Sequence, residues 1–320
     1  MKLSVRIRGE GVAARCCAHL LNPVSCEPAS RPRVPVIMLS EAAQELIRDI
    51  FQQDHLFRAL PRIRKRVVKW GPEAAPVELN HSAVIVSEDA LLSSLGTVKE
   101  GQGDADWTIC AAPPLPAATT EHRFGQRIAT PVQVRLKGPA DACWMESVED
   151  GWLFLNAGWL IAVGASPEEL LKRSTLVKEQ LESFDSGAVH FPASPRMVTP
   201  LGGDGWICCG TAAMAFDPLC GDGTAQAVRE AILASAVLRA VARGEEHGPL
   251  LAHYQARLTA GFARHLAHCH QFYSSGGSGP WWKSQVDSVE QGLAWCRRGM
   301  EGHGRFRYRL NGFELESISV

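Results

Sequence analysis

The sequence has almost no net charge and no long uninterrupted run of apolar residues. Its 33 Lys and Arg residues nearly balance its 34 Asp and Glu residues, so electrostatics give no reason to expect a nucleic-acid or anionic-membrane partner. The longest nearly apolar stretch, Trp152 to Ala165, contains Asn156 and is shorter than the roughly 20 residues that span a bilayer. Near the N-terminus, Arg6, Arg8 and Glu10 interrupt what would be the apolar core of a secretory signal. We therefore expect a cytoplasmic protein with no nucleic-acid and no membrane partner.

Paired cysteine motifs and common catalytic motifs are also missing. None of the ten cysteines forms a CxxC pair, so reduced and mostly buried thiols are the expected state. The sequence contains no P-loop and no GxSxG nucleophile elbow. His265, His268 and Cys269 share one face of an expected helix and could bind a transition metal, but three such residues within one turn often arise by accident. We expect a packed helix there and no metal.

The chain does have ample apolar material for a large core. Of its 320 residues, 46% are apolar and 21% are charged, which is typical of a globular protein. Single cores rarely grow beyond about 250–300 residues, so the length predicts one large domain or two lobes. No internal repeat is present.

A strand, a tight turn and a helix are expected at the start of the chain. Residues 3–7 alternate as in a strand, and Gly9, Gly11 and Ala14 then form a GxGxxA pattern before an apolar helix. In such a turn the first glycine allows the tight bend and the second lets the backbone approach a pyrophosphate. The pattern alone is weak evidence, because any tight strand-to-helix turn can carry it.

A second strand is predicted over Val34 to Leu39. A dinucleotide-binding fold would place an acid at its end to bind the ribose hydroxyls, but Ser40 occupies that position and Glu41 comes one residue late. This substitution weakens a nucleotide-binding interpretation without excluding it.

The hydrophobic period changes to two after Pro131. Strands of an antiparallel meander are predicted at 132–136, Cys143–Val148, Trp152–Asn156 and Trp159–Val163. A helix with an N-terminal capping box should follow, from Ser166 to about Ser183.

The last part of the chain is expected to be mainly helical. A short strand at Trp206–Gly210 and a loop at Phe216–Thr224 lead into a long amphipathic helix. Two further helices are predicted at 250–273 and 284–298, separated by a Gly/Ser-rich segment.

The segment Gly210–Gly223 resembles the second FAD-contact motif of the p-hydroxybenzoate hydroxylase type of flavoprotein, the group that includes aromatic monooxygenases and tryptophan halogenases. That motif runs Gly-Asp-Ala-Ala, then Asp-Pro, then a glycine-rich helix start. Here the letters GTAA at 210–213 precede Asp217, Pro218, Gly221 and Gly223. The GxGxxA turn, the antiparallel strands and this motif occur in the family's order over most of residues 1–245.

The resemblance implies a mixed α/β (α+β) fold, with a Rossmann-like FAD-binding βαβ lobe, an inserted antiparallel β-sheet substrate lobe and C-terminal helices. The FAD-binding lobe would take residues 1–120 and 191–245. The substrate lobe would take 121–190, and the C-terminal helical region 246–320.

The resemblance also implies that FAD is the cofactor. Gly9, Gly11 and Ala14 would hold the pyrophosphate, and the second motif would contact the flavin and its ribityl chain through Thr211, Asp217, Pro218, Gly221 and Gly223. A glycine-rich loop at a helix start suits this role, because free backbone N–H groups and the helix dipole favour negative charge. No catalytic residue is marked by the sequence.

Three departures from the family pattern concern cofactor affinity. Thr211 replaces the family's Asp, Ser40 stands in place of the ribose-binding acid, and Cys110 to Ala112 replace a strand-end Asp-Ala-Thr-Gly. Each lost charge-assisted hydrogen bond costs about 1.5–3 kcal/mol, so FAD could be bound weakly.

The resemblance implies an FAD-dependent oxidoreductase of monooxygenase type, working through a reduced-flavin and oxygen intermediate. Its substrate would be an aromatic small molecule or a peptide- or carrier-bound group. The segments Asp150–Trp152 and Gly279–Trp282 are more similar to flavoproteins that hydroxylate tryptophan during quinone-cofactor maturation than to tryptophan halogenases. The alternative is an accessory or binding protein that has lost tight FAD binding.

Two further segments invite a functional interpretation. Trp281 and Trp282 follow the Gly/Ser-rich segment and could form a lid or dock a protein partner, or else pack in the core. The alternating basic residues between Arg62 and Lys69 predict a solvated strand face, with docking of an acidic partner as the alternative.

Overall fold

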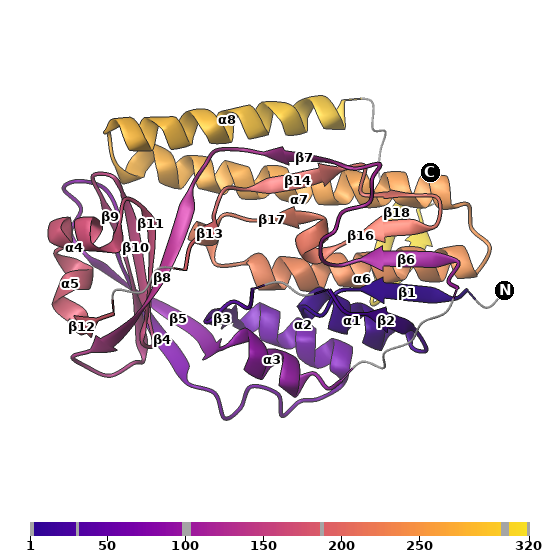
Figure 1. Ribbon diagram of the computed structural model, residues 1–320, viewed down its shortest axis with the longest axis horizontal. Coiled ribbons are helices and arrows are strands. Elements are labelled where there is room, and N and C mark those ends of the chain that lie inside the picture. Colours follow the sequence, from indigo (N-terminus) through magenta and orange to yellow (C-terminus); the bar gives the residue numbers. More distant parts are fainter. Residues whose placement is uncertain (1–2, 30–31, 98–103, 186–188, 302–306, 319–320) are drawn as a thin grey trace.

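The computed structural model describes residues 3–29, 32–97, 104–185, 189–301 and 307–318. A mainly parallel sheet occupies one side of the molecule and a larger, mainly antiparallel sheet the other (Figure 1). Two long helices, α7 (His247–Gly276) and α8 (Pro280–Met300), run alongside both. The mixed α/β prediction is therefore confirmed. No helix within the described ranges is long and apolar enough to cross a membrane.

The smaller sheet has five strands in the order β15-β16-β6-β1-β2. Its members are β1 (Val5–Arg8), β2 (Ser25–Glu27), β6 (Trp107–Cys110), β15 (Gly202–Gly203) and β16 (Trp206–Cys208). All neighbouring pairs are parallel except β15–β16. Along β1 the buried Val5 and Ile7 alternate with the partly exposed Arg6 and Arg8, whereas β6 and β16 are largely apolar and buried.

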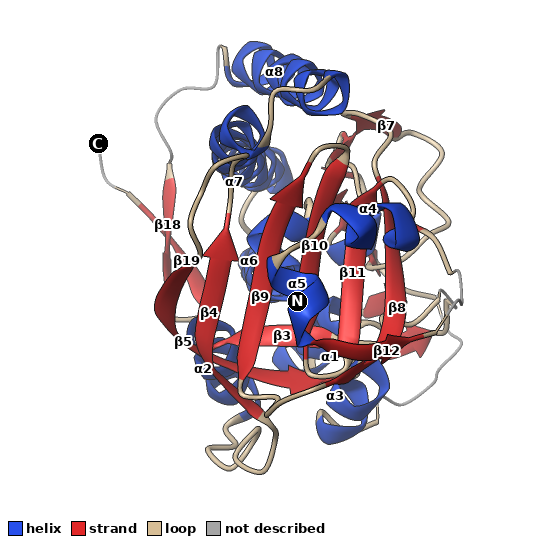
Figure 2. Cartoon of the chain, turned by 90° about the vertical axis from the view of Figure 1, so that its left-hand side faces the viewer, coloured by secondary structure: helices blue, strands red, loops and turns tan. Residues whose placement is uncertain are grey.

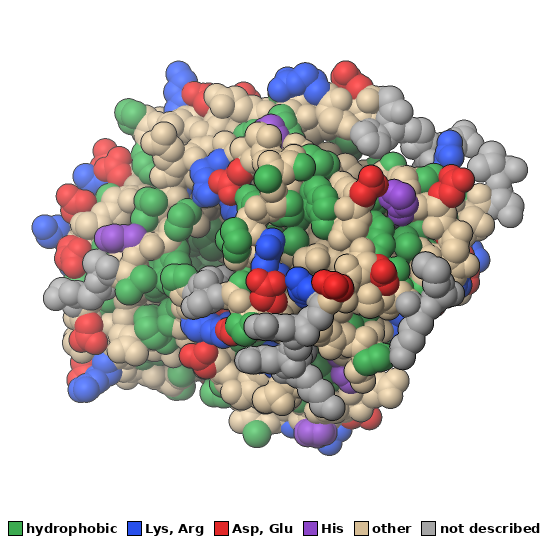
Figure 3. Space-filling view, turned by 45° about the vertical axis from the view of Figure 1, so that its right-hand side comes forward, with side chains coloured by type: hydrophobic (Ala, Val, Ile, Leu, Met, Phe, Trp, Pro, Cys, Tyr) green, Lys and Arg blue, Asp and Glu red, His purple; other side chains and the backbone are tan. Residues whose placement is uncertain are grey.

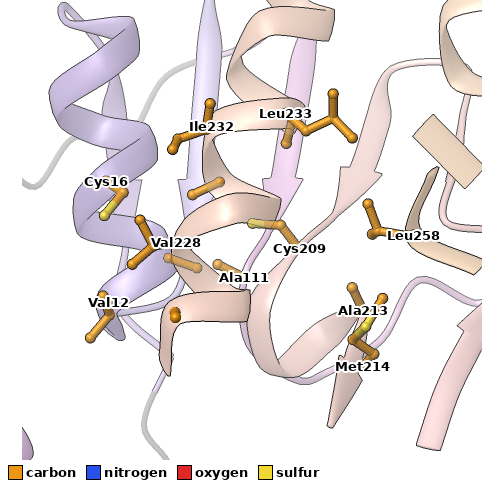
Figure 4. Packing of buried hydrophobic residues seen from close by; sticks show 14 of the residues in the cluster. Val12, Cys16, Ala111, Cys209, Ala213, Met214, Val228, Ile232, Leu233 and Leu258 are labelled. Carbon is orange, nitrogen blue, oxygen red and sulfur yellow. The ribbon is translucent and has the colours of Figure 1, made fainter. Parts of the chain in front are cut away.

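Helices α1 (Val12–Leu21) and α6 (Gly223–Ala242) pack side by side against the smaller sheet. Figure 4 shows Cys16 of α1 close to Val228 and Ile232 of α6. The 3₁₀ turn η1 (Gly210–Ala212) comes close as well, since a Cβ atom on Gly210 would lie 2.8 Å from Ala13 Cβ. Small side chains in this layer bring the starts of both helices to the same edge of the sheet.

The larger sheet has nine strands, in the order β12-β8-β11-β10-β9-β4-β5-β3 with β13 beside β8. They are β3 (Ile37–Ser40), β4 (Arg62–Lys69), β5 (Val77–Val86), β8 (Ile128–Leu136), β9 (Ala142–Val148), β10 (Gly151–Asn156), β11 (Trp159–Gly164), β12 (Leu181–Phe184) and β13 (Phe191–Pro192). The four predicted antiparallel strands are confirmed, but only β9, β10 and β11 form a meander, because β8 pairs with β11 rather than with β9. However, the sheet is wider than the predicted lobe 121–190, because β3, β4 and β5 join it from residues 37–86. The basic segment forms β4, where Lys65 pairs with Glu78 at 2.9 Å.

The two faces of this sheet have different neighbours. Leu153 and Leu155 pack with α4 (Pro167–Arg173) and α5 (Leu176–Gln180), which cover one face (Figure 2). Trp152 and Phe154, one position out of phase, belong to the core shared with the smaller sheet. Alternate side chains along β10 therefore point to the face covered by α4 and α5 and to the face that looks toward the smaller sheet.

The helix predicted from Ser166 to about Ser183 is divided into two short helices, α4 and α5. The helix from Ser166 begins with the expected capping box but ends at Arg173, and residues up to Gln180 form α5. The cause is tertiary: the buried carboxylate of Glu146 accepts the backbone N–H groups of Thr175, Leu176 and Val177. This side chain starts a second helix, so the prediction of one helix to Ser183 is wrong.

The remaining elements complete the described chain. They are α2 (Glu41–Phe51), α3 (Glu88–Ser94), β7 (Thr120–Arg123), β14 (Arg196–Thr199), β17 (Met214–Ala215), η2 (Pro218–Cys220), β18 (Tyr308–Asn311) and β19 (Glu314–Ser317). Strands β7, β14 and β17 form a small separate sheet.

Trp282 is part of the core rather than a lid. Its side chain is 1% exposed, and its Nε1 donates a hydrogen bond to the Val148 carbonyl at 2.9 Å. A Cβ atom on Gly276 or Gly277 would collide with its ring, so these glycines make room for the indole. Trp281 packs edge-on against Trp282, with ring centroids 4.8 Å apart. The lid prediction is wrong for Trp282, because the Gly/Ser-rich segment packs tightly around it.

Candidate functional site

The GxGxxA residues form the predicted turn between β1 and α1. Gly9 has φ +133°, and a Cβ atom there would lie 3.2 Å from Ala112 Cβ, so the position requires glycine. Gly11 is the N-cap of α1, and Ala14 is buried inside that helix. The strand–turn–helix context expected from the sequence is thus confirmed.

Glu27 stands at the strand end where dinucleotide-binding folds carry an acid. It ends β2, the parallel neighbour of β1, and follows Gly9 by close to the spacing of about 20 residues found in dinucleotide-binding folds. Ser40 instead ends an antiparallel strand and caps α2, accepting the Ala43 N–H. The assignment of Ser40 to the ribose position is therefore wrong. Strand β2 has only three residues, too few for a recognisable pattern.

The second motif forms a loop that is held from behind by Asp217. This side chain is 1% exposed, and its Oδ1 accepts the Leu219 N–H at 3.0 Å. Its Oδ2 accepts the Tyr273 hydroxyl at 2.8 Å and pairs with Arg127 Nε at 2.9 Å. The Asp217 carboxylate is thus committed to protein partners.

Arg127 is a residue that the sequence analysis missed. Its guanidinium is fully buried, donates to Gln285 Oε1 at 2.8 Å and lies over the Tyr273 ring, 4.8 Å from the centroid. It thereby connects the start of β8 with α7, α8 and the Asp217 loop. A lone Arg before a strand carried no signal of this role in the sequence.

Both motifs border one cavity of about 430 Å³. Gly9 and Ala14 do not line the cavity. The other six of the eight predicted site residues do: Gly11, Thr211, Asp217, Pro218, Gly221 and Gly223. Residues of the larger sheet, among them Phe154 and Ile161, form the opposite wall. On the face drawn in Figure 3, hydrophobic side chains gather around a hollow near the middle of the molecule.

Two helix N-termini at this cavity carry free hydrogen-bond donors. Gly11 begins α1 and Asp222 begins α6, and neither helix start has a hydrogen bond from a capping side chain among the described residues. Asp222 pairs with Arg229 at 2.7 Å instead of capping. In contrast, side chains cap α2 and α3: Ser40 accepts the Ala43 N–H, and Ser87 accepts the Ala90 N–H. Uncapped N–H groups at two helix starts suit negatively charged ligand groups.

Besides Asp217, the cavity has another carboxyl group nearby, that of Glu230 close to Thr211. Thr211 Oγ1 donates to the Ala111 carbonyl at 3.2 Å. Glu230, on α6, lines the cavity and accepts the Gly210 N–H at 2.7 Å. Burial raises the pKa of Glu230 to about 8. Glu230 was not predicted as a site residue, although an acid between Val228 and Ala231 on the apolar helix face is a signal visible in the sequence.

The sheet wall of the cavity is apolar except at Asn156. This side chain is 1% exposed, and its Oδ1 is buried without a hydrogen-bond partner among the described residues. Phe154, Ile161 and Phe191 are its apolar neighbours along the wall. A buried amide oxygen without a partner is costly, which marks Asn156 as a candidate ligand contact.

The cluster of potential metal ligands on α7 differs from the predicted set of His265, His268 and Cys269. His265 and Cys269 gather with Cys220 of η2, and the three ligand atoms lie within 4.8 Å of one another, whereas His268 is not part of the group. His265 Nε2 already accepts the Asp217 N–H at 2.8 Å, and its ring stacks on Phe216.

No protein-family model matches the chain, and the search of curated proteins found no match. Solved structures do match over nearly the whole chain. The flavin-dependent halogenase CmlS has a TM-score of 0.75 at 15% identity, covering 99% of this chain and 84% of that one. The peptidyl tryptophan dihydroxylase QhpG has a TM-score of 0.73 at 21% identity, covering 99% and 86%.

The myxobacterial chondrochloren halogenase CndH, an FAD-dependent enzyme, has a TM-score of 0.75 at 17% identity, covering 94% of this chain and 91% of that one. The chain has the fold of flavin-dependent halogenases and monooxygenases. The resemblance read from the two motifs is therefore confirmed at the level of the fold. In this flavoprotein fold, the cavity lies where the two motifs meet the larger sheet.

Proposed function

We propose that the protein is an FAD-dependent oxidoreductase of monooxygenase type. The observation that carries this proposal is that one cavity borders the GxGxxA turn, the Asp217–Gly223 loop and the wall of the larger sheet. The fold shared with flavin-dependent halogenases and a tryptophan dihydroxylase supports it.

The residues present fit FAD. Free N–H groups at the start of α1 suit the pyrophosphate, and Glu27 at the end of β2 suits the adenosine ribose. The start of α6, with Pro218 and Gly221 beside it, suits the flavin ring. Bound there, FAD would supply electron transfer and oxygen chemistry, while this chain binds, orients and excludes water.

We infer that the substrate is an aromatic small molecule or an aromatic side chain in a peptide or on a carrier. Phe154, Ile161 and Phe191 offer apolar and aromatic surface, and Asn156 offers an amide oxygen that needs a hydrogen-bond donor. An aromatic group that carries an N–H or O–H would satisfy both. QhpG is described as acting on peptidyl tryptophan, which supports including peptides in the search.

The alternative, a flavoprotein-like scaffold without tight FAD binding, loses one of its supports. It relied on three missing family residues, and Glu27 removes the absent ribose acid from that argument. Thr211 and Cys110 still distinguish the chain from the family pattern. FAD binding decides between the two functions.

A matched pair of glycine variants tests the cofactor site. Gly223 and Gly248 both lie in the first turn of a helix, and a Cβ atom at either meets nothing within 4 Å, but only Gly223 lines the cavity. We expect Gly223→Val to weaken FAD binding at least tenfold (about 1.4 kcal/mol) and Gly248→Val to leave it unchanged.

Binding is measured by titrating FAD and following the quenching of flavin fluorescence. The melting temperatures of both variants serve as the control for folding. No FAD binding by the unmodified protein, or equal loss in both variants, would contradict the proposal. Loaded protein, supplied with reductant and oxygen, is then screened by mass spectrometry for oxygen insertion into indoles, phenols and tryptophan peptides.

A further inference from the structure

A pair of cysteines, one on the loop beside the flavin-type site and one on α7, lies close to this site. Cys220 ends η2, between Pro218 and Gly221, which both line the cavity. Cys269 lies on α7, directly behind the loop, and its Sγ is within 4.8 Å of Cys220 Sγ. Cys220 is partly exposed, whereas Cys269 is fully buried.

This arrangement divides the two thiols into different roles. A hydrogen bond from the Cys269 thiol, helped by the nearby His265, lowers the pKa of Cys220 to about 5 against the effect of burial. The same hydrogen bond and burial raise the pKa of Cys269. Cys220 is therefore the thiolate that a solute can reach, and Cys269 is a protonated thiol held next to it.

A metal site is the competing interpretation of the same cluster. A metal ion would need the lone pair of His265 Nε2, but that atom accepts the Asp217 N–H at 2.8 Å and lies 3.4 Å from Cys269 Sγ. Binding a metal would break the hydrogen bond that holds the Asp217 loop. Oxidation of the thiol pair needs no such break.

We propose that Cys220 and Cys269 form a reversible disulfide, with Cys220 as the peroxide-reactive thiol and Cys269 as the resolving thiol. The Cys220 thiolate attacks one oxygen of hydrogen peroxide, the O–O bond breaks, and the other oxygen leaves as hydroxide and takes a proton to become water. Cys220 is then a sulfenic acid. The Cys269 sulfur, losing its proton, attacks the Cys220 sulfur, and the S–O bond breaks with release of a second water. Two thiols lose two electrons in total, and the peroxide gains them.

The disulfide would act on the cofactor loop. An S–S bond is about 2.05 Å long, so sulfurs up to 4.8 Å apart must approach, which draws η2 toward α7 and away from the cavity. Because Pro218 and Gly221 move with Cys220, we expect FAD to bind at least tenfold more weakly to the oxidised protein. This consequence rests on the proposed function, whereas disulfide formation does not.

The experiment treats the intact 320-residue chain with stoichiometric hydrogen peroxide and maps its cysteines by mass spectrometry of non-reduced peptides. We expect a Cys220–Cys269 crosslink that a dithiol reverses. In Cys269→Ser we expect a sulfenic acid at Cys220 that dimedone traps, and in the control Cys296→Ser, which removes a buried thiol of α8, the normal crosslink. The mapping of the unmodified protein needs no variant, so a folding defect in Cys269→Ser leaves the test intact.

Several outcomes would overturn the proposal. These are peroxide oxidation at other cysteines while Cys220 stays reduced, a Cys220 crosslink to a cysteine other than Cys269, and stoichiometric zinc that shields both thiols in the protein as purified. FAD titrations before and after oxidation are scored separately. Crosslinking without any FAD binding by the reduced protein would refute the proposed function and leave the disulfide standing.

Discussion

At the scale of single residues, three side chains contradict what their sequence context predicts. Glu230 lies on an apolar helix face, Asn156 lies in an apolar strand, and Arg127 is a buried cation. Arg127 is balanced by Asp217 at 2.9 Å, whereas Asn156 Oδ1 has no partner among the described residues. Residues that break a local rule concentrate at functional sites, and all three lie at or directly behind the cavity.

Glu230 leads to a prediction about pH. Burial raises its pKa in the folded protein to about 8 from the ordinary value of 4.5, so the folded state holds a proton that the unfolded state releases between these values. Stability must therefore fall as the pH rises from about 5 to about 8, by up to ~1.4 kcal/mol per pH unit from this group. Because the glutamine stays neutral, we expect Glu230→Gln to make the free energy of unfolding less dependent on pH between about 5 and 8.

Urea unfolding of FAD-free protein at several pH values measures the effect. The comparison variant is Glu316→Gln, which alters a carboxyl group on the exposed hairpin β18–β19 and leaves Glu230 in place. If the free energy of unfolding fell equally steeply between pH 5 and 8 in Glu230→Gln and in the unmodified protein, Glu230 would not be the source of the pH dependence.

At the scale of elements, the start of α5 depends on a side chain from another strand. Its N-cap, Thr175, makes no side-chain capping bond, but the Glu146 carboxylate on β9 accepts the first N–H groups of the helix and pairs with Lys69 at 3.4 Å. A five-residue helix cannot form by itself, so this contact determines whether α5 exists.

We expect Glu146→Gln to lower the free energy of unfolding by about 2 kcal/mol or more, because a buried carboxylate with several hydrogen bonds is replaced by a neutral amide that satisfies fewer of them. Glu149→Gln is the matched control, since Glu149 is exposed and its ion pair among the described residues is with the exposed Arg173 at 3.3 Å. Glu149→Gln should change the free energy of unfolding by no more than about 0.5 kcal/mol. Chemical denaturation measures both, and equal effects would show that Glu146 does not cap α5.

At the scale of the whole molecule, the aromatic group around Trp282 joins the C-terminal helices to the larger sheet. Trp282 contacts Trp70 of the segment after β4 and Tyr273 of α7, with ring centroids 5.7 Å and 5.9 Å apart. Its hydrogen bond to the Val148 carbonyl reaches the end of β9. These contacts hold the two C-terminal helices to the larger sheet.

This arrangement predicts that Trp282→Ala destabilises the protein by about 3–5 kcal/mol, the usual cost of truncating a large buried aromatic side chain. Trp281→Ala, at a partly exposed position, should cost roughly half of that or less. Thermal and urea unfolding of the two variants provide the measurement. A smaller loss for Trp282→Ala than for Trp281→Ala would show that Trp282 is not the anchor.

The sequence by itself determined the elements whose information is local. The GxGxxA turn, the capping box at Ser166, the alternating strands of 132–163 and the glycine-rich start of α6 are all specified by residues within one turn or one strand, and all were predicted. Their order along the chain was enough to indicate the flavoprotein fold.

Only the tertiary structure decided which segments meet. A three-residue strand, β2, pairs with β1 and ends at Glu27, whereas Ser40 ends a strand of the other sheet. Trp282 lost its freedom to act as a lid because two glycines and the Val148 carbonyl form its site. Cys220 met Cys269 from a different element of the chain. The physical reason is common to all three: these contacts join residues far apart in sequence, and packing rather than local periodicity selects them.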